Sequence, residues 1–141
     1  MKSYTDLEQS KKLAEILPIE SADMRYGYIA PYDYSDRMHD GGYDKIPYPK
    51  DFLVKNPNFS ANKYDAELPC WSLAALLDQL EYVIHDEDGH EFQLRIIKEG
   101  VQYYLIYDGV DYAAYYDTPL FDDPVDACVD MILILKENDL L

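Results

Sequence analysis

The first apolar residues of the chain recur with the spacing of an amphipathic helix. Their shared face consists of Leu7, Leu13, Ala14 and Leu17. Thr5 and Glu8 have the spacing of a capping box, in which each side chain accepts a hydrogen bond from the other residue's backbone amide. Pro18 cannot continue a helix because it lacks an amide hydrogen. The pattern therefore predicts a short first helix between Thr5 and Pro18.

The regular spacing of apolar positions is lost between residues 26 and 68. This segment contains seven tyrosines and four prolines, and only Met24–Ile29 at its start has an extended character. A segment of this length without a regular element is unusual within a compact domain. We therefore predict an irregular, tyrosine-rich excursion over residues 26–68, which is either an ordered cover held by its tyrosine rings or a mobile lid.

The most apolar run of the chain extends from Leu68 to Leu80. Its apolar residues fall on most faces of a helix, which is typical of a helix buried on all sides. Pro69 suits a first helical turn, where the backbone amide has no partner within the helix. The run predicts a central, well-buried helix.

Apolar and polar residues alternate from residue 81 to residue 116. The alternation predicts short strands over residues 81–85, 92–96, 101–107 and 110–116. Turn residues separate them at Asp86–Gly89, Glu99–Gly100 and Asp108–Gly109, and the last pair is typical of a two-residue hairpin turn. Because connections this short force neighbouring strands to be antiparallel, we predict a meander of three or four strands.

A helix with clear N-terminal capping residues is predicted at the end of the chain. Asp122 or Asp123 can cap it, and Pro124 suits its first position. Its buried stripe consists of Val125, Cys128, Val129, Ile132 and Leu135. The predicted order is helix, irregular segment, helix, antiparallel meander, helix. Helices packed against such a sheet make an α+β fold, which we predict as a single domain over residues 1–141.

The composition argues against a membrane or secreted protein. Hydrophobic residues make up 48% of the chain, which is ordinary for a globular domain. No run approaches the roughly 18 apolar residues of a membrane helix, and the N-terminus has no apolar signal core. Cys70 and Cys128 lie in apolar patterns and are interpreted as buried thiols, with a disulfide or a metal pair as the alternative. We therefore expect a cytoplasmic protein that does not bind membranes.

Acidic residues greatly outnumber basic ones. The chain has 12 basic and 28 acidic residues, a net charge of −16. The second half, residues 71–141, holds 16 of the acidic residues and only three basic ones. Without a basic stripe to displace counterions, direct binding to nucleic acid is not expected. A basic protein partner, or solubility alone, would explain the charge.

Three segments in this order resemble a known family. They are residues 10–18 with 20–24, residues 70–77, and residues 123–128 with Met131 and Ile132. The family comprises small uncharacterised proteins encoded by phages, prophages and other mobile elements of gut bacteria. The resemblance covers most of the chain and is weakest between Tyr26 and Leu68. It implies a mobile-element context and carries no activity.

Possible metal ligands are densest between residues 85 and 91. The candidates are His85, Asp86, Asp88 and His90. The run lacks the spacing of a calcium loop, so an exposed acidic hairpin turn is the favoured interpretation. Cys70 could act as a nucleophile only with a base such as His39, and no catalytic cysteine motif surrounds it. We expect no cofactor and no enzymatic activity.

The tyrosines of the predicted meander divide between its two faces. Tyr103, Tyr107, Tyr112 and Tyr116 share one face by alternation, which places Tyr104 and Tyr115 on the other. Carboxylates border that second face at Asp108, Asp111 and Asp117. If no helix covers it, aromatic area edged with carboxylates suits recognition of a basic protein. The alternative is that these rings pack against the tyrosine-rich segment and complete the core.

Two functions of different classes follow from these features. The first is a non-enzymatic accessory protein of a mobile element that binds a protein partner through its acidic and aromatic surface. That partner could be a basic, nucleic-acid-binding protein, with carboxylates placed where phosphates would lie. The alternative is a small-ligand-binding or catalytic domain with a tyrosine-lined pocket between residues 26–68 and the sheet.

Overall fold

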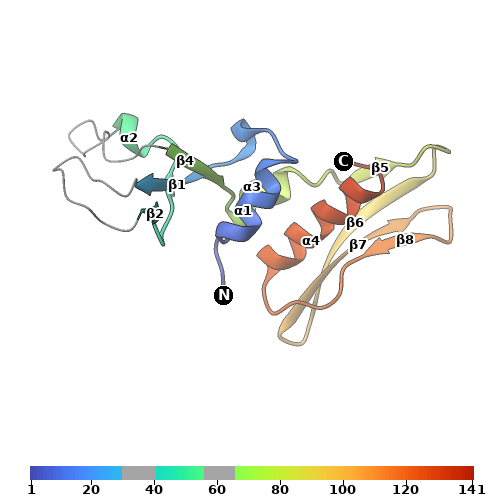
Figure 1. The fold of residues 1–141 in the computed structure, drawn as a ribbon. Coiled ribbons are helices and arrows are strands. Elements are labelled where there is room, and N and C mark those ends of the chain that lie inside the picture. Colours follow the sequence, from blue (N-terminus) through green and yellow to red (C-terminus); the bar gives the residue numbers. More distant parts are fainter. Residues whose placement is uncertain (30–40, 56–65) are drawn as a thin grey trace, which may run out of the picture. The chain divides into compact units, whose positions relative to one another are not determined.

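The structure is a computed structural model that describes residues 1–29, 41–55 and 66–141, without the side chains of residues 53 and 54 (Figure 1). Contacts among the described residues group into two compact units. The N-terminal unit comprises Asp6–Ser72, and the meander unit comprises Met1–Thr5 with Leu73–Leu141. Each contains helices and a four-stranded antiparallel sheet, so the predicted α+β class is confirmed. Whether these two units form the single domain predicted over residues 1–141 depends on how they pack together, so the single domain stays a prediction.

Helix α1 spans Leu7–Ala14 and begins at a capping box. The Asp6 carboxylate accepts a hydrogen bond from the Gln9 amide at 2.8 Å, and the Gln9 side chain accepts one from the Asp6 amide at 3.1 Å. The predicted box of Thr5 and Glu8 is wrong by one residue, because Thr5 is fully buried and Asp6 takes the cap position.

The sheet of the N-terminal unit is built around β1, which spans Met24–Ile29. Strand β4 (Ala66–Cys70) pairs with one side of β1, and the two-residue strands β2 (Gly42–Tyr43) and β3 (Tyr48–Pro49) pair with β1 as well, all antiparallel. The extended character expected for Met24–Ile29 is confirmed as β1, whereas the described residues 41–55 and 66–68 contain short strands and a helical turn where an irregular excursion was predicted. Strands of two residues have no readable alternation, so only their pairing with β1 defines them.

The core of the N-terminal unit lies between α1 and its sheet. Helix α1 packs against β4, and a 3-10 turn (η1, Ile19–Ser21) and a short helix (α2, Phe52–Lys55) complete the described elements. Buried apolar side chains of this unit include Leu13, Leu17, Tyr26, Leu68, Cys70 and Trp71.

The predicted helix from Leu68 to Leu80 is wrong at its start, where Leu68–Cys70 belong to β4 and the helix begins only at Leu73. Pro69 is tolerated there because, among the described strands, β4 pairs only with β1, so its missing amide hydrogen costs no ladder bond on the outer edge. The strand ends at a polar anchor: the Asp23 carboxylate accepts hydrogen bonds from the Ser72 amide at 2.9 Å and the Ser72 hydroxyl at 2.5 Å. The helical part of the run is α3, which spans Leu73–Asp78.

The predicted antiparallel meander is confirmed in the meander unit. Its sheet has the order β5 (Val83–His85), β6 (Glu91–Glu99), β7 (Gln102–Gly109) and β8 (Tyr115–Asp117), each strand antiparallel to the next. The two long strands β6 and β7 form its centre. The short outer strands limit the exposed edges, which lowers the risk of edge-to-edge aggregation.

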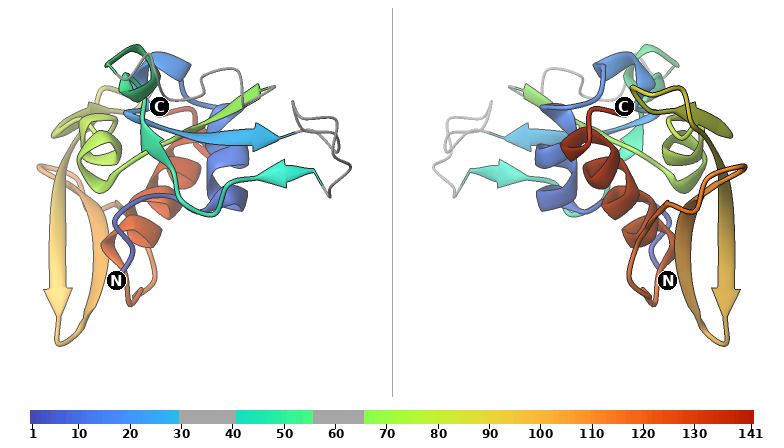
Figure 2. Two further views of the ribbon diagram at one scale, coloured as in Figure 1. Left: turned by 90° about the vertical axis from the view of Figure 1, so that its left-hand side faces the viewer. Right: turned by 90° about the vertical axis from the view of Figure 1, so that its right-hand side faces the viewer.

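Helix α4 spans Pro124–Glu137 and packs against β7 and α3 (Figure 2). The predicted start is confirmed: the Asp123 carboxylate accepts a hydrogen bond from the Val125 amide at 3.1 Å, and Pro124 follows the cap. The other Asp123 oxygen accepts the Lys2 backbone amide, and the Lys2 ammonium lies 2.8 Å from the Asp126 carboxylate. These bonds attach the N-terminal residues to the start of α4.

The last strand differs from the prediction. In place of a two-residue turn at Asp108–Gly109 and a strand from residue 110, the chain turns over residues 110–114, and the Gly109 amide bonds the Ala114 carbonyl at 3.0 Å. A Cβ atom at Gly109 would collide with the carbonyl of Tyr112, so glycine permits this close approach. Among the described residues, no helix combines the length and apolar character needed to cross a membrane.

Candidate functional site

One face of the meander sheet is not covered by any described element of its unit. The strand registers place on it Val83, Gln93, Arg95, Ile97, Tyr104, Ile106, Asp108, Tyr115 and Asp117. We call this set the open face. None of its members is buried, whereas the alternate residues Phe92, Leu105 and Tyr107 on the side of α4 are at most 1% exposed. Helix α4 therefore covers one side of the sheet and leaves the other side accessible within this unit.

The structure brings together four of the five residues predicted for a partner surface. Tyr115 lies directly opposite Asp108 on neighbouring strands, and Asp117 lies directly opposite Ile106, two residues from Asp108. Tyr104 is on the same face one row further along β7. Asp111 is exposed in the turn over residues 110–114 and is not part of the open face.

Sequence reasoning missed the aliphatic part of the open face. Ile106 lies next to Arg95 across the β6–β7 ladder, and Ile97 lies next to Tyr104. Together they make an apolar centre with carboxylates towards β8. Because Ile106 is two residues from Tyr104, alternation along the strand could have placed it on this face. Its neighbours on β6 follow only from the pairing register of β6 and β7.

The carboxylates beside this centre outnumber the cations of the open face. Asp108 and Asp117 occupy diagonal positions on neighbouring strands, where side chains are close enough to interact. Neither has an ion-pair or hydrogen-bond partner among the residues that the structure describes. Arg95, the open face's only cation, lies diagonal to Asp108 across the β6–β7 ladder and two strands from Asp117. The β8 side of the face therefore has a local negative charge.

The tyrosines on the other side of the sheet have structural contacts. Tyr107 is fully buried, and its hydroxyl donates a hydrogen bond to the Glu81 carbonyl at 2.5 Å. Burial, with the Glu81 charge as a smaller contribution, raises the pKa of Tyr107 well above its usual range, so the ring stays neutral. Tyr116 lies opposite Tyr107 and packs on Phe92, with ring centres 5.3 Å apart. These rings complete the core.

The predicted metal ligands lie in the turn between β5 and β6. One Asp86 oxygen accepts hydrogen bonds from the amides of Asp88 at 3.0 Å and His90 at 2.8 Å, and the other lies 2.9 Å from Nδ1 of His90. The His90 ring stacks on Tyr112 with centres 3.7 Å apart and planes within 6°. We call Asp86, His90 and Tyr112 the turn clip, because it joins this turn to the turn over residues 110–114.

The turn clip accounts for the arrangement of the acidic residues. Ligand atoms of Asp86, Asp88 and His90 lie within 4.8 Å of one another and could in principle hold a cation. His85 is not among them; its Nε2 lies 3.8 Å from the Glu91 carboxylate. Since Asp86 already bonds two amides and an imidazole of its own turn, the geometry favours the interpretation of a hairpin turn that stabilises itself.

We expect the turn clip to stabilise the fold at neutral pH and to fail in acid. Burial raises the pKa of Asp86, but the hydrogen bonds and charge of His90 and the Asp88 amide outweigh it, so the pKa lies below its usual range. A lowered pKa means that the stabilisation is present above about pH 4 and is lost as the pH falls through the folded-state pKa. Asp86→Asn should therefore lower the free energy of unfolding at pH 7, and the difference from wild type should shrink by pH 3.

Urea unfolding at both pH values measures this difference. Asp111→Asn is the matched control, since it removes one exposed carboxylate from the turn on the other side of the clip. It should leave the free energy of unfolding within about 0.5 kcal/mol of wild type at both pH values. A deficit of Asp86→Asn that persists unchanged at pH 3 would contradict the ionic role of Asp86.

The two cysteines are buried free thiols, as the favoured interpretation predicted. Burial raises the pKa of Cys128 to about 12, so its reactive thiolate is scarce at neutral pH. The suggested base for Cys70, His39, lies outside the described residues. Neither described thiol environment indicates a nucleophile.

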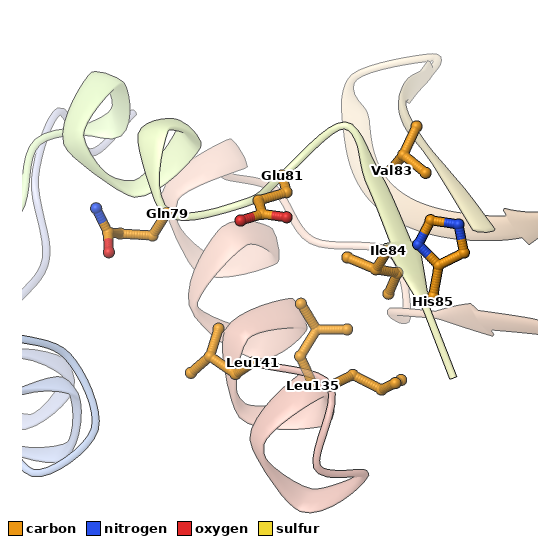
Figure 3. A pocket seen from close by; sticks show the side chains of 8 residues that line it. Gln79, Glu81, Val83, Ile84, His85, Leu135 and Leu141 are labelled. Carbon is orange, nitrogen blue, oxygen red and sulfur yellow. The ribbon is translucent and has the colours of Figure 1, made fainter. Parts of the chain in front are cut away.

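A hollow of about 290 Å³ lies between β5 and the end of α4 (Figure 3). It is lined by Gln79, Glu81, Val83, Ile84, His85, Leu135, Leu140 and Leu141. In Figure 3, Ile84 points from β5 towards Leu135, and the His85 ring lies on the other side of the strand. This lining contains no tyrosine and no cysteine, serine or threonine. The predicted tyrosine-lined pocket involves residues 26–68, which are only partly described, and it stays a prediction.

Comparison of the chain with protein-family models, with curated proteins and with solved structures found no match. The predicted resemblance to mobile-element proteins is therefore not tested.

Proposed function

We propose that this chain is a non-enzymatic protein-binding module whose open face contacts the partner. The observation that carries the proposal is a sheet with one side packed by α4 and with tyrosine and isoleucine side chains on its other, accessible side. The mobile-element context expected from the resemblance belongs to the same proposal, since small accessory proteins of such elements can act by binding another protein.

The chemistry of the open face supports binding to a protein. Tyr104 and Tyr115 supply large, rigid contact area that loses little side-chain entropy when it is covered. Tyr115 is 60% exposed, which is high for an aromatic residue in a strand. Aromatic residues are enriched in the centres of protein interfaces, and charged residues belong to their rims. The open face has this arrangement, with Ile97, Ile106 and Tyr104 in the centre and carboxylates beside them.

The described residues support an enzyme less well. Catalysis needs a nucleophile or an acid–base pair whose pKa values are matched to the reaction. The hollow between β5 and α4 offers Glu81 and His85 as its titratable side chains, and both are exposed. The described residues therefore support a protein-binding module better than an enzyme.

Removing the two rings of the open face should strongly weaken partner binding. We expect Tyr104→Ala with Tyr115→Ala to lose about tenfold or more in capture of the partner, because exposed aromatic anchors carry much of the energy of an interface. Affinity purification with the tagged full chain, read by quantitative mass spectrometry, compares the variant with wild type. A photo-crosslinking residue at position 115 then tests contact directly.

The matched control carries two substitutions of exposed apolar residues away from the open face. Ile46 is 72% exposed in the N-terminal unit, and Val101 is 82% exposed in the turn between β6 and β7. Ile46→Ala with Val101→Ala should capture the same partner as wild type. Urea unfolding of all three proteins checks that they are folded. A partner captured equally by the Tyr104/Tyr115 variant would refute the proposal.

A further inference from the structure

We infer that the open face binds a partner segment in which lysine or arginine alternates with apolar side chains. In this arrangement the basic residues lie on Asp108 and Asp117, and the apolar residues lie on Ile106 and Tyr104. The inference rests on the proposed function and adds the chemistry of the partner to it.

The two carboxylates call for an external cation. Asp108 and Asp117 occupy neighbouring strands at diagonal positions, and like charges so placed repel each other. The one cation of the described residues near them is Arg95, which lies diagonal to Asp108 on β6 but two strands from Asp117. The meander unit has only four basic residues, and two of these have other contacts. Lys2 bonds Asp126, and the Lys98 ammonium lies over the Tyr103 ring at 5.6 Å. A partner's ammonium or guanidinium group near both carboxylates would remove the repulsion.

The charge of the whole unit excludes the other main occupants. The meander unit has 16 acidic residues against its four basic ones. This field repels nucleic acid, an anionic membrane and a second copy of this chain, and it accelerates the approach of a basic protein. Charge complementarity therefore selects a basic partner.

The apolar centre excludes a partner that is only basic. Ile97 lies opposite Tyr104, and Ile106 lies opposite Arg95 on one side and Asp117 on the other. Asp117 is therefore the one carboxylate directly opposite either isoleucine. A uniformly basic segment would bring its charges onto these side chains and against Arg95. Cations should therefore lie towards β8, and apolar or acidic side chains towards β6. A set of bound peptides should therefore share this order of basic and apolar residues.

Selection from a random library of 12-residue peptides tests the inference. The bait is the full chain, and the library is first depleted on the Tyr104→Ala, Tyr115→Ala variant, so that the retained peptides depend on the open face. We expect the retained peptides to be enriched in lysine and arginine interspersed with apolar residues. Retained peptides that are acidic or uncharged would overturn the inference and leave the proposed function standing. If no peptide depends on the open face, both fail.

A pair of double variants then tests the two carboxylates. With a retained peptide labelled for fluorescence anisotropy, Asp108→Asn with Asp117→Asn should weaken binding about tenfold or more, and the loss should shrink at high salt. Asp78→Asn with Asp139→Asn removes the same charge from exposed positions on other elements and should change binding less than about threefold. Equal losses in the two double variants would show attraction to the overall charge alone and would overturn the placement of the cations.

Discussion

Replacing Trp71 with alanine is expected to lower the free energy of unfolding by about 3–5 kcal/mol. Trp71 is 0% exposed, and its indole Nε1 donates a hydrogen bond to the Ser21 hydroxyl at 2.9 Å. The substitution removes the largest buried side chain of the described chain and leaves a cavity beside the Ser21 hydroxyl, which keeps only its bond to the Pro18 carbonyl. Since small domains are stable by about 5–15 kcal/mol, this loss is a large share of the total. Urea unfolding followed by far-UV circular dichroism measures it.

Two further substitutions separate packing from hydrogen bonding at Trp71. Trp71→Phe keeps an aromatic ring and loses the bond to Ser21, so we expect a smaller cost of about 1–2 kcal/mol. Ser21→Ala keeps the ring and leaves the indole N–H without this acceptor, and it should cost about 1–3 kcal/mol. An alanine variant of Trp71 that loses less than about 1 kcal/mol would show that this side chain does not organise a core.

Leu105→Ala is expected to cost about 2–5 kcal/mol of unfolding free energy. Leu105 is 0% exposed at the centre of β7, on the side of the sheet that α4 covers. Its amide donates to the Thr118 hydroxyl at 3.1 Å, and its carbonyl accepts the Thr118 amide at 3.0 Å, so the backbone around it is held on both sides. A rigid surrounding cannot close over the missing side chain, which places the cost towards the upper end of the range.

The residue opposite Leu105 is its control. Ile96 lies directly across the β6–β7 ladder on the same face, but it is 51% exposed because it lies beyond the area that buries Leu105. Ile96→Ala should therefore cost less than about 1 kcal/mol, although it removes a side chain of equal size. Similar costs at the two positions in urea unfolding would contradict the described position of α4 over the sheet.

The predictions that held concern features whose cause lies within a few residues. The cap at Asp123, the proline that follows it and the alternation of the meander strands depend on neighbours along the chain, and the structure has them where the sequence indicated. The acidic excess is likewise a property of composition. The cap at Asp6 in place of Thr5 shows the limit of this reasoning. Both residues are good helix caps in the local sequence, and the burial of Thr5 decides that Asp6 is the cap.

The candidate site was predictable in part. Alternation placed Tyr104 and Tyr115 on one face with Asp108 and Asp117, and the structure agrees. It could not place Arg95 or Ile97 beside them, because their position depends on the β6–β7 register. It also extended the last strand over residues 110–114, where the close approach of Gly109 to Tyr112 produces a wider turn.

The sequence by itself determined the class of fold, the strand order of the meander, the capped last helix and the sign of the surface charge. Only the tertiary structure decided that Ala66–Cys70 is a strand, that β1 organises a second sheet, and that α4 covers the Leu105 side and leaves the Tyr104 side open. The reason is physical. A short segment such as Leu68–Cys70 fits a first helical turn or the end of a strand equally well, and the choice comes from partners far along the chain, as when Leu68 lies opposite Tyr26.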